Sequence, residues 1–180
     1  MRLALLACVL VPMLASARDD AKAPVDQAHA LINSFGVMCR LEAPDFDHLV
    51  AKATAMRMKV LDDRTSTTPK GEHVLDRAWI GMLTTGPFAL RAEQMIGPKG
   101  IVTSCAVEGP VPDVDAFRDI VIQTHHLNPA QQPQMAEGAR TYYWDNFTGD
   151  GSTLIMRDME RPTAHFVQVK LVNMVKAVAP

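Results

Sequence analysis

Residue types that could carry out chemistry gather around one predicted turn near the C-terminus. Two expected strands meet at Glu160-Arg161-Pro162, and Asp158 and His165 stand on either side of that turn. Asp158 could partner His165 across the hairpin, with Arg157 and Arg161 adding to a polar site. These two residues are therefore the candidate catalytic residues of a small hydrolase. The alternative is a solvated turn, in which exposed ion pairs contribute less than about 1 kcal/mol each.

Sequence motifs of known catalytic sites are missing from the chain. The sequence contains no G-x-S-x-G, S-x-x-K or H-E-x-x-H motif and no glycine-rich phosphate loop. The chain therefore favours a protein without catalytic activity, and the hydrolase that uses Asp158 and His165 is the alternative.

Metal-binding patterns are weak as well. His125 and His126 are adjacent at the end of an expected helix, so their rings point in different directions and suit the helix dipole better than one metal ion. The segment 145–151 resembles a calcium loop, but Asp150 and Met156 occupy positions where that loop needs Gly and Glu. We expect a hairpin turn there, and we expect neither a metal nor another cofactor.

The N-terminus predicts export. Residues 1–17 combine Arg2, an apolar run and a final Ala15-Ser16-Ala17, which is the pattern of a secretory signal peptide cleaved after Ala17. Cys8 ends a segment similar to a lipobox, but the apolar run before it is short and continues past it, so a lipoprotein is the less favoured alternative. No later stretch reaches about 18 apolar residues, so we expect no transmembrane segment after removal of the leader and a periplasmic or secreted protein.

Two cysteines remain outside the leader, and they predict one disulfide. A bond between Cys39 and Cys105 would close a loop of about 67 residues and stabilise the fold by about 4 kcal/mol in the chain-entropy model. The places of the two cysteines in the expected elements favour this bond. Cys39 continues the apolar stripe of an expected helix, and Cys105 shares one face of an expected strand with Ile101 and Val107. A redox pair or thiol nucleophile is the alternative, and no C-x-x-C motif supports it.

Periodicity and turn residues define the expected elements. The sequence predicts a signal peptide at 1–17, a flexible tether at 18–24, one α+β domain at 25–172 and a tail at 173–180. Long polar loops are expected at 62–73 and 128–139. Because the strand connections are short, we expect an antiparallel sheet of about six strands covered by two or three helices. The expected helices are Asp26–Cys39, Asp45–Met58 and Asp113 or Asp115 to Leu127, and the expected strands are Trp79–Leu83, Phe88–Met95, Ile101–Val107, Thr141–Phe147, Ser152–Met159 and Ala164–Val172.

The order of elements also suggests an internal repeat. A helix, a long loop and three strands occur twice, so we hypothesise a duplicated α-βββ unit with the helix Asp26–Cys39 added in front. The alternative is that any two three-stranded meanders look alike. Landmarks match at offsets of 65 (Trp79 and Trp144), 64 (Leu90 and Leu154) and 71 (Phe46 and Phe117). Trp79 and Trp144 are expected in the core.

Composition narrows the class of partner. The formal net charge is −2 with neutral histidines, and no basic cluster is present, which argues against nucleic-acid binding. Long loops and uncovered sheet faces are where binding usually occurs. Size, export and a single disulfide suit an envelope or periplasmic binding or inhibitor-type protein, whose partner would be an envelope or secreted protein or a small ligand.

Overall fold

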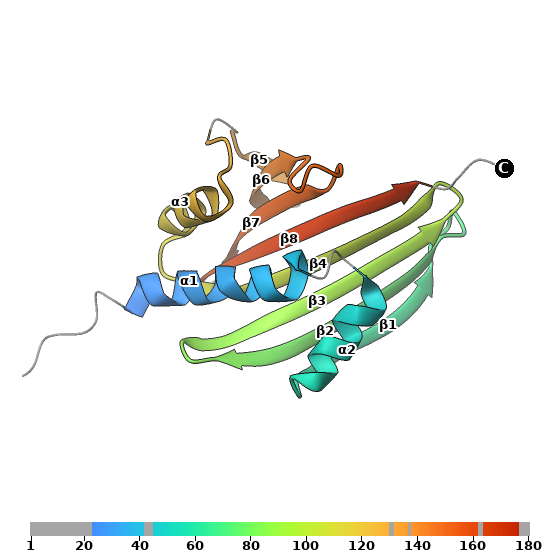
Figure 1. Ribbon diagram of the computed structural model, residues 1–180, viewed down its shortest axis with the longest axis horizontal. Coiled ribbons are helices and arrows are strands. Elements are labelled where there is room, and N and C mark those ends of the chain that lie inside the picture. Colours follow the sequence, from blue (N-terminus) through green and yellow to red (C-terminus); the bar gives the residue numbers. More distant parts are fainter. Residues whose placement is uncertain (1–22, 42–44, 130–131, 137, 162–163, 177–180) are drawn as a thin grey trace, which may run out of the picture.

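The computed structural model describes residues 23–41, 45–129, 132–136, 138–161 and 164–176 (Figure 1). The predicted signal peptide, its cleavage site, Cys8 and the first part of the expected tether lie outside these residues. Within them, no helix is both long enough and apolar enough to cross a membrane.

The described residues form three α-helices, one π-helical turn and eight strands. The helical elements are α1 (Ala23–Phe35), η1 (Gly36–Arg40), α2 (Phe46–Ala55) and α3 (Val114–His125). The strands are β1 (Lys59–Thr67), β2 (His73–Leu83), β3 (Gly86–Gly97), β4 (Gly100–Val111), β5 (Gln134–Ala136), β6 (Ala139–Asp145), β7 (Thr153–Arg161) and β8 (Ala164–Lys176).

All eight strands belong to one antiparallel sheet with the order β1-β2-β3-β4-β8-β7-β6-β5. The predicted α+β class, antiparallel sheet and helical cover are confirmed, but the strand count is eight rather than six. The sheet centre is the pairing of β4 with β8, whose register runs from Gly100 opposite Lys176 to Val111 opposite His165.

Strand β1 lies in a segment that was expected to be largely a loop. Its side chains are mostly exposed, and a bulge between Val60 and Asp62 interrupts the alternation that marks a strand in a sequence. Cross-strand ion pairs help to hold it, with Asp63 2.8 Å from Arg77. Charges and a bulge are the usual protection of an edge strand. The short β5 lies in the second predicted loop, and β8 continues past Val172 into the expected tail.

The three helices cover one face of the sheet, as Figure 1 shows. Helix α1 contacts β4, α2 contacts β3 and β4, and α3 contacts β8 and α1. Helices α2 and α3 both begin at an aspartate whose carboxylate accepts a backbone N–H three residues on, at 3.0 Å from His48 for Asp45 and from Ala116 for Asp113. None of the described helices lies on the other face, which we call the open face.

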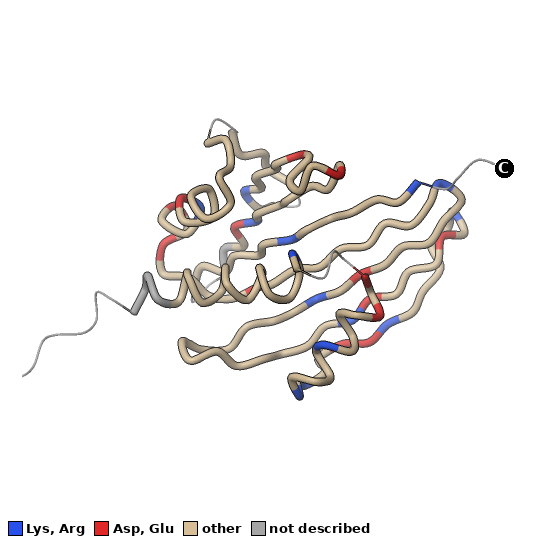
Figure 2. The backbone as a smooth tube through the Cα atoms, in the orientation of Figure 1, with Lys and Arg blue, Asp and Glu red and all other residues tan. Residues whose placement is uncertain are grey.

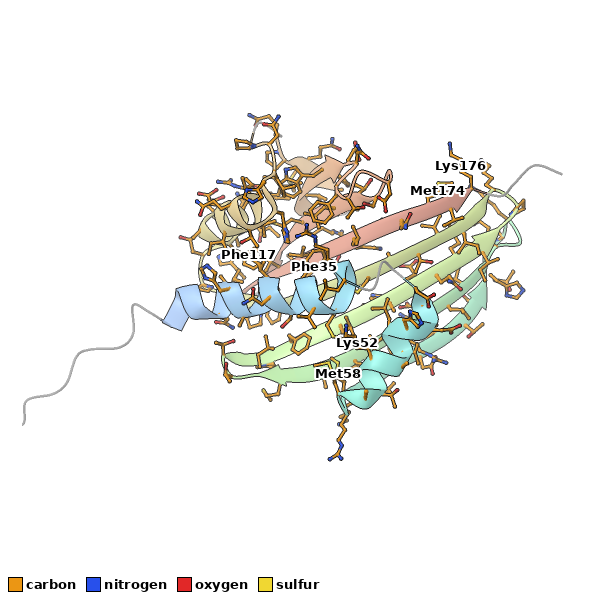
Figure 3. The ribbon with its side chains drawn as sticks, in the orientation of Figure 1. Phe35, Lys52, Met58, Phe117, Met174 and Lys176 are labelled. Carbon is orange, nitrogen blue, oxygen red and sulfur yellow. A yellow bond between two sulfur atoms is a disulfide. The ribbon has the colours of Figure 1, made fainter. Side chains whose placement is uncertain are left out.

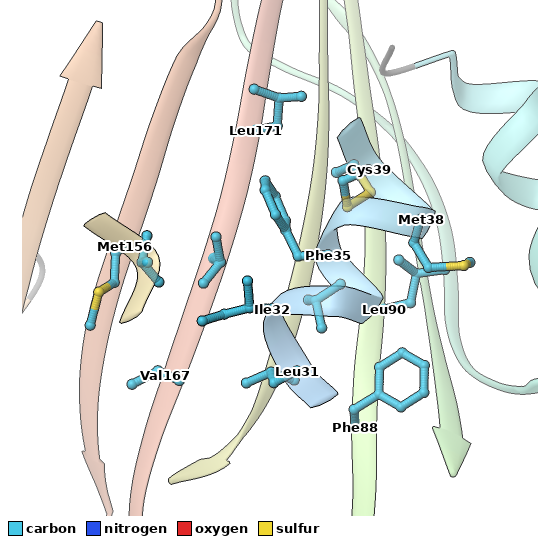
Figure 4. Packing of buried hydrophobic residues seen from close by; sticks show 14 of the residues in the cluster. Leu31, Ile32, Phe35, Met38, Cys39, Phe88, Leu90, Met156, Val167 and Leu171 are labelled. Carbon is cyan, nitrogen blue, oxygen red and sulfur yellow. A yellow bond between two sulfur atoms is a disulfide. The ribbon is translucent and has the colours of Figure 1, made fainter. Parts of the chain in front are cut away.

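The core lies between the helices and the covered face of the sheet (Figure 4). Trp79 and Trp144 are both buried in this region, as expected. Its largest fully buried side chains come from α1, η1, α2, α3 and the central strands: Phe35, Met38, Leu49, Leu90, Val107, Phe117, Val121, Leu154, Met156, Val167, Val169 and Leu171.

A disulfide joins this helical layer to the sheet centre. Cys39 in η1 is bonded to Cys105 in β4, their Cα atoms are 5.4 Å apart, and both residues are fully buried. The predicted bond is therefore present, and its position agrees with the helical and strand periodicities.

The two halves of the sheet share one register. Trp79 pairs with Leu90 across β2 and β3, and Trp144 pairs with Leu154 across β6 and β7. Leu90 in turn pairs with Val107, and Leu154 with Leu171. The offsets of 65 and 64 therefore relate residues in equivalent places. With α1 and η1 set aside, the described residues of each half form one helix followed by four strands, α2 with β1–β4 and α3 with β5–β8.

The helices correspond at a different offset from the one predicted. The N-caps of α2 and α3, Asp45 and Asp113, are 68 positions apart (113 − 45), whereas the predicted offset was 71. The match of Phe46 with Phe117 rested on residue type. In the structure the buried face of α2 begins at Phe46 and that of α3 at Val114.

Candidate functional site

Asp158 lies on the covered face of β7, where Arg140 holds it. The Asp158 side chain is 8% exposed, and its Oδ2 accepts hydrogen bonds from Nε and Nη2 of Arg140 at 2.9 and 2.7 Å. These bonds raise the pKa of Arg140. His165 is half-exposed, and its Nδ1 is 3.9 Å from Asp158 Oδ1, which is beyond hydrogen-bond distance. The two candidate residues are therefore neighbours, but the firm partner of Asp158 is Arg140.

Of the other two members of the predicted polar site, the structure places only the Arg157 side chain. Arg157 precedes Asp158 in β7, so its side chain points to the open face. Arg161 ends β7, and its side chain lies outside the described part of the structure. The predicted turn therefore does not bring the four side chains onto one face.

Helix α3 covers the Arg140–Asp158 pair. Arg140 Nη1 is 3.9 Å from Asp115 in the first turn of α3. Arg118 donates to Asp115 and Asp119, and its guanidinium lies 5.7 Å from the ring centre of Tyr142 in β6. These contacts attach α3 to β6 and β7. Asp158 therefore has a structural role in this attachment, whether or not it also takes part in a reaction.

His125 is packed between aromatic rings. Its ring centre is 5.8 Å from that of Phe35 and 5.3 Å from that of Phe147, and its Nδ1 is 3.3 Å from Nη1 of Arg40. Burial, together with the nearby charge of Arg40, lowers the pKa of His125 to about 4. At neutral pH the ring is uncharged, which differs from the expected interaction with the helix dipole. His126 ends α3 in the left-handed conformation.

The segment that resembles a calcium loop is a hairpin turn, as expected. Asp150 Oδ1 accepts hydrogen bonds from Thr148 and from Ser152 N, and these bonds lower the pKa of Asp150 to about 2. Asn146 Oδ1 accepts from Gly151 N at 3.0 Å. Within the described residues no group of three or more His, Cys, Asp or Glu side chains is placed to hold a metal ion.

An apolar depression lies where α1 and α2 meet the end of β2 and the start of β3. Two cavities of about 350 and 430 Å³ adjoin there and share Met56, Met82 and Phe88 in their linings. We call them together the methionine groove. Met56 is 52% exposed and Met82 76% exposed, so these thioethers lie at the surface instead of filling the core. The remaining lining is Ala30, Asn33, Ser34, Val37, Met38, Arg57, Met58, Lys59, Ile80, Gly81, Leu83 and Thr84.

The shape of the methionine groove depends on Gly81. A side-chain carbon at this position would lie 2.4 Å from the Phe88 ring and 2.9 Å from the Met58 methyl group. The ring and the thioether therefore approach the β2 backbone where it has no side chain. Figure 3 shows Met58 just beyond the end of α2, and Met174 at the opposite end of the sheet.

The charged residues that line the methionine groove are cations. Arg57 and Lys59 follow α2 and are both exposed. One helical turn before Met56, Lys52 Nζ donates to Val37 O at 2.7 Å and ties α2 to η1. Elsewhere the charges are mixed, and both signs are present along β1 and β2 in Figure 2. The groove thus combines flexible apolar side chains with a basic rim.

The methionine groove was not predicted from the sequence. The closeness of Met56 and Met58 was visible, but methionines usually fill gaps in a core. Met82 is more than twenty residues away in the chain, and it joins them only because β2 runs back beneath α2. Exposure of a methionine inside an apolar run has no sequence signature.

A comparison of this chain with models of protein families, with curated proteins and with solved structures gives no match. The function is therefore argued from the geometry and chemistry of its surfaces.

Proposed function

We propose that this chain is an exported, non-catalytic binding protein that docks a segment of a partner protein in the methionine groove. The observation that carries the proposal is the exposure of Met56 and Met82, which both line two adjoining apolar cavities. Exposed apolar patches of this kind mark interaction sites. Methionine side chains adapt to differently shaped apolar partners.

The charged residues that line the groove indicate which kind of partner segment would bind there. Arg57 and Lys59 line the groove at one side, and no acidic side chain lines either cavity in the described structure. The partner is therefore a segment with bulky apolar side chains next to acidic ones, as in an acidic amphipathic helix. Such a partner suits an envelope or secreted protein that this chain holds or inhibits.

Catalysis has less support. A hydrolase would place Asp158 and His165 in hydrogen-bond contact within a cavity. Neither residue lines the methionine groove, and Asp158 is bonded to Arg140 instead. We therefore prefer binding to turnover.

Export is supported by the leader-like residues 1–17 and by a disulfide in the folded domain. Expression of the full chain, cell fractionation and N-terminal sequencing test it. The expected mature protein is outside the cytoplasm and begins at Arg18. A protein that keeps residues 1–17 in the cytoplasm would contradict export, and a lipid-modified Cys8 would establish the lipoprotein alternative.

Docking is tested with two synthetic amphipathic peptides that share one apolar face and carry either acidic or basic polar residues. We expect fluorescence anisotropy to show saturable binding of the acidic peptide and at least tenfold weaker binding of the basic one. Met56→Asp and Met82→Asp should each weaken the binding of the acidic peptide at least tenfold. The matched control is Met174→Asp, because Met174 is 48% exposed and lies at the other end of the sheet.

Several results would oppose this function. Equal affinity for both peptides would show that the basic rim does not select an acidic partner. Equal loss in the Met174→Asp control would show non-specific adhesion. A photocrosslinker at position 82 that captures the same proteins as one at position 174 in intact cells would exclude a specific partner at the groove.

We also propose that the chain arose by duplication of a unit of one helix and four strands. The support is the shared register of Trp79–Leu90 and Trp144–Leu154. A superposition of the two halves whose best fit falls at another register would contradict the duplication.

A further inference from the structure

The cysteines of the folded domain are closed to oxidants. Cys39 and Cys105 are bonded to each other and fully buried, and Cys8 lies in the predicted leader. The mature chain that the leader predicts therefore offers no free thiol. Methionine is the other side chain whose sulfur oxidants attack, and an exported protein works outside the reducing cytosol.

Exposure separates the methionines that line the methionine groove. Met56 and Met82 are exposed, and each lines both cavities. Met38 lines one of these cavities but is almost completely buried. An oxidant in solution therefore reaches the two outer thioethers of the groove, while the fold shields Met38.

Met56 and Met82 are exposed because the elements beside them end. Met56 is the C-cap of α2, and Arg57 follows it in the left-handed conformation, so the chain leaves the helix at this point. Met82 lies on β2 beyond Ile80, which pairs with the first residue of β1. Strand β1 therefore gives no cover to β2 at Met82. The fold thus holds both thioethers at the surface.

A peroxide converts a thioether to a sulfoxide by transfer of one oxygen atom. The O–O bond of hydrogen peroxide breaks and an S–O bond forms. The sulfur loses two electrons, and the peroxide is reduced to one molecule of water. The product is a polar and chiral side chain in place of a flexible apolar one.

We propose that oxidants of the peroxide class release the docked partner by converting Met56 and Met82 to sulfoxides. The inference rests on the proposed docking function and assigns a modification that regulates the same groove. Burial of a sulfoxide oxygen against an apolar partner side chain costs free energy, because nothing there donates a hydrogen bond. Where Arg57 or Lys59 donates to the new oxygen, that cation is taken from the acidic residues of the partner.

The docked partner in turn protects the groove. A segment that covers Met56 and Met82 keeps the oxidant away from their sulfur atoms. Met135 and Met174 are also exposed, but they line neither cavity. Their oxidation therefore provides an internal reference in the same sample.

The test uses the full mature protein and the acidic peptide, made without Met, Trp or Cys. The protein is treated with hydrogen peroxide, catalase removes the oxidant, and fluorescence anisotropy measures docking while mass spectrometry locates the sulfoxides. We expect oxidation of Met56 and Met82, and at least tenfold weaker binding of the peptide. Peptide that is present during the treatment should slow oxidation at these two positions and not at Met174.

A matched pair of double variants assigns the effect. Met56→Leu/Met82→Leu keeps the apolar side chains and removes the sulfur atoms, so it should bind the peptide equally well before and after treatment. Met135→Leu/Met174→Leu should remain as sensitive as the wild type. Thermal unfolding of each protein before and after treatment checks that the fold is intact.

The outcomes distinguish the inference from the function on which it rests. Absence of binding to the untreated protein would overturn the docking function and this inference with it. Normal binding by a protein whose Met56 and Met82 are oxidised would overturn the inference alone. A treated Met56→Leu/Met82→Leu protein that loses binding would also overturn it, because the sensitive group would then lie elsewhere.

Discussion

Arg140 and Asp158 are direct cross-strand partners on β6 and β7, and two hydrogen bonds from Arg140 converge on one carboxylate oxygen of Asp158. This pair lies under α3 at a place where the sequence suggested an Asp–His site. The pair should therefore stabilise the folded protein.

Asp158→Asn should lower the free energy of unfolding by about 1–3 kcal/mol, because it removes a charge-assisted bond to a nearly buried oxygen. His165→Ala should change it by less than about 0.5 kcal/mol, since His165 is half-exposed and 3.9 Å away. Urea unfolding measures both. The reverse order would show that His165, and not Arg140, is the working partner of Asp158, and assays of His165→Ala with chromogenic esters would then become the priority.

Loss of the Cys39–Cys105 bond should destabilise the fold strongly. The bond closes a loop with a sequence separation of 66, which predicts up to about 4 kcal/mol. We expect a Cys39→Ala/Cys105→Ala double variant to unfold at lower denaturant concentration than the oxidised protein. The reduced wild-type protein should fall near the double variant. Identical midpoints with and without reductant would contradict a structural role.

Stability should fall as the pH drops from about 6.5 to about 4. The folded pKa of His125 is lowered to about 4 from the usual 6.5 of a histidine, so in this window the unfolded chain takes up a proton that the folded chain does not. The stabilisation is complete above pH 6.5 and declines through the window. After allowance for partial exposure, the loss is about 1–2 kcal/mol.

Urea unfolding at several pH values measures this effect. His125→Phe keeps a ring between Phe35 and Phe147 and should flatten the profile. His126→Asn, a neighbour that tolerates the left-handed conformation, should leave the profile unchanged. A profile that is equally steep in the His125→Phe variant would assign the acid sensitivity to other groups.

Gly81→Ala should destabilise the protein by about 1–3 kcal/mol and weaken docking, because the added carbon would overlap the Phe88 ring and the Met58 methyl group. Gly36→Ala is the matched control, since nothing lies within 4 Å of a carbon added there. Thermal unfolding and the acidic peptide measure the two effects. A Gly81→Ala protein as stable as the wild type would show that ring and thioether move aside freely.

The sequence was informative where one face of an element is buried. The apolar stripe that contains Phe35 and Cys39 and the alternation around Cys105 predicted the helix, the strand and the bond between them. The offsets between the tryptophans and between Leu90 and Leu154 predicted equivalent positions in the sheet. In each case burial imposes a period on the residue types.

The missed elements lack that period. In β1, Asp62 and Asp63 follow a bulge at the sheet edge, and the polar run that they begin has no alternation of apolar and polar residues. The sequence therefore predicts a loop where the structure has a strand. The methionine groove escaped prediction for another reason. Met82 and Met56 line one depression only because of the way the strands and α2 are arranged, which no local pattern encodes.

The central pairing of β4 with β8 has a consequence for the growing chain. When the first four strands have been made, β4 is an unpaired edge of twelve residues, and its partner begins more than fifty residues later, at Ala164. Because β4 and β8 occupy equivalent places, the β4 edge of one unfinished chain can accept the β4 edge of another in the same antiparallel sense. Chains truncated after α3 should therefore form dimers or aggregates. In the full chain, the delay before β8 is synthesised decides whether β4 pairs within its own chain or with another chain.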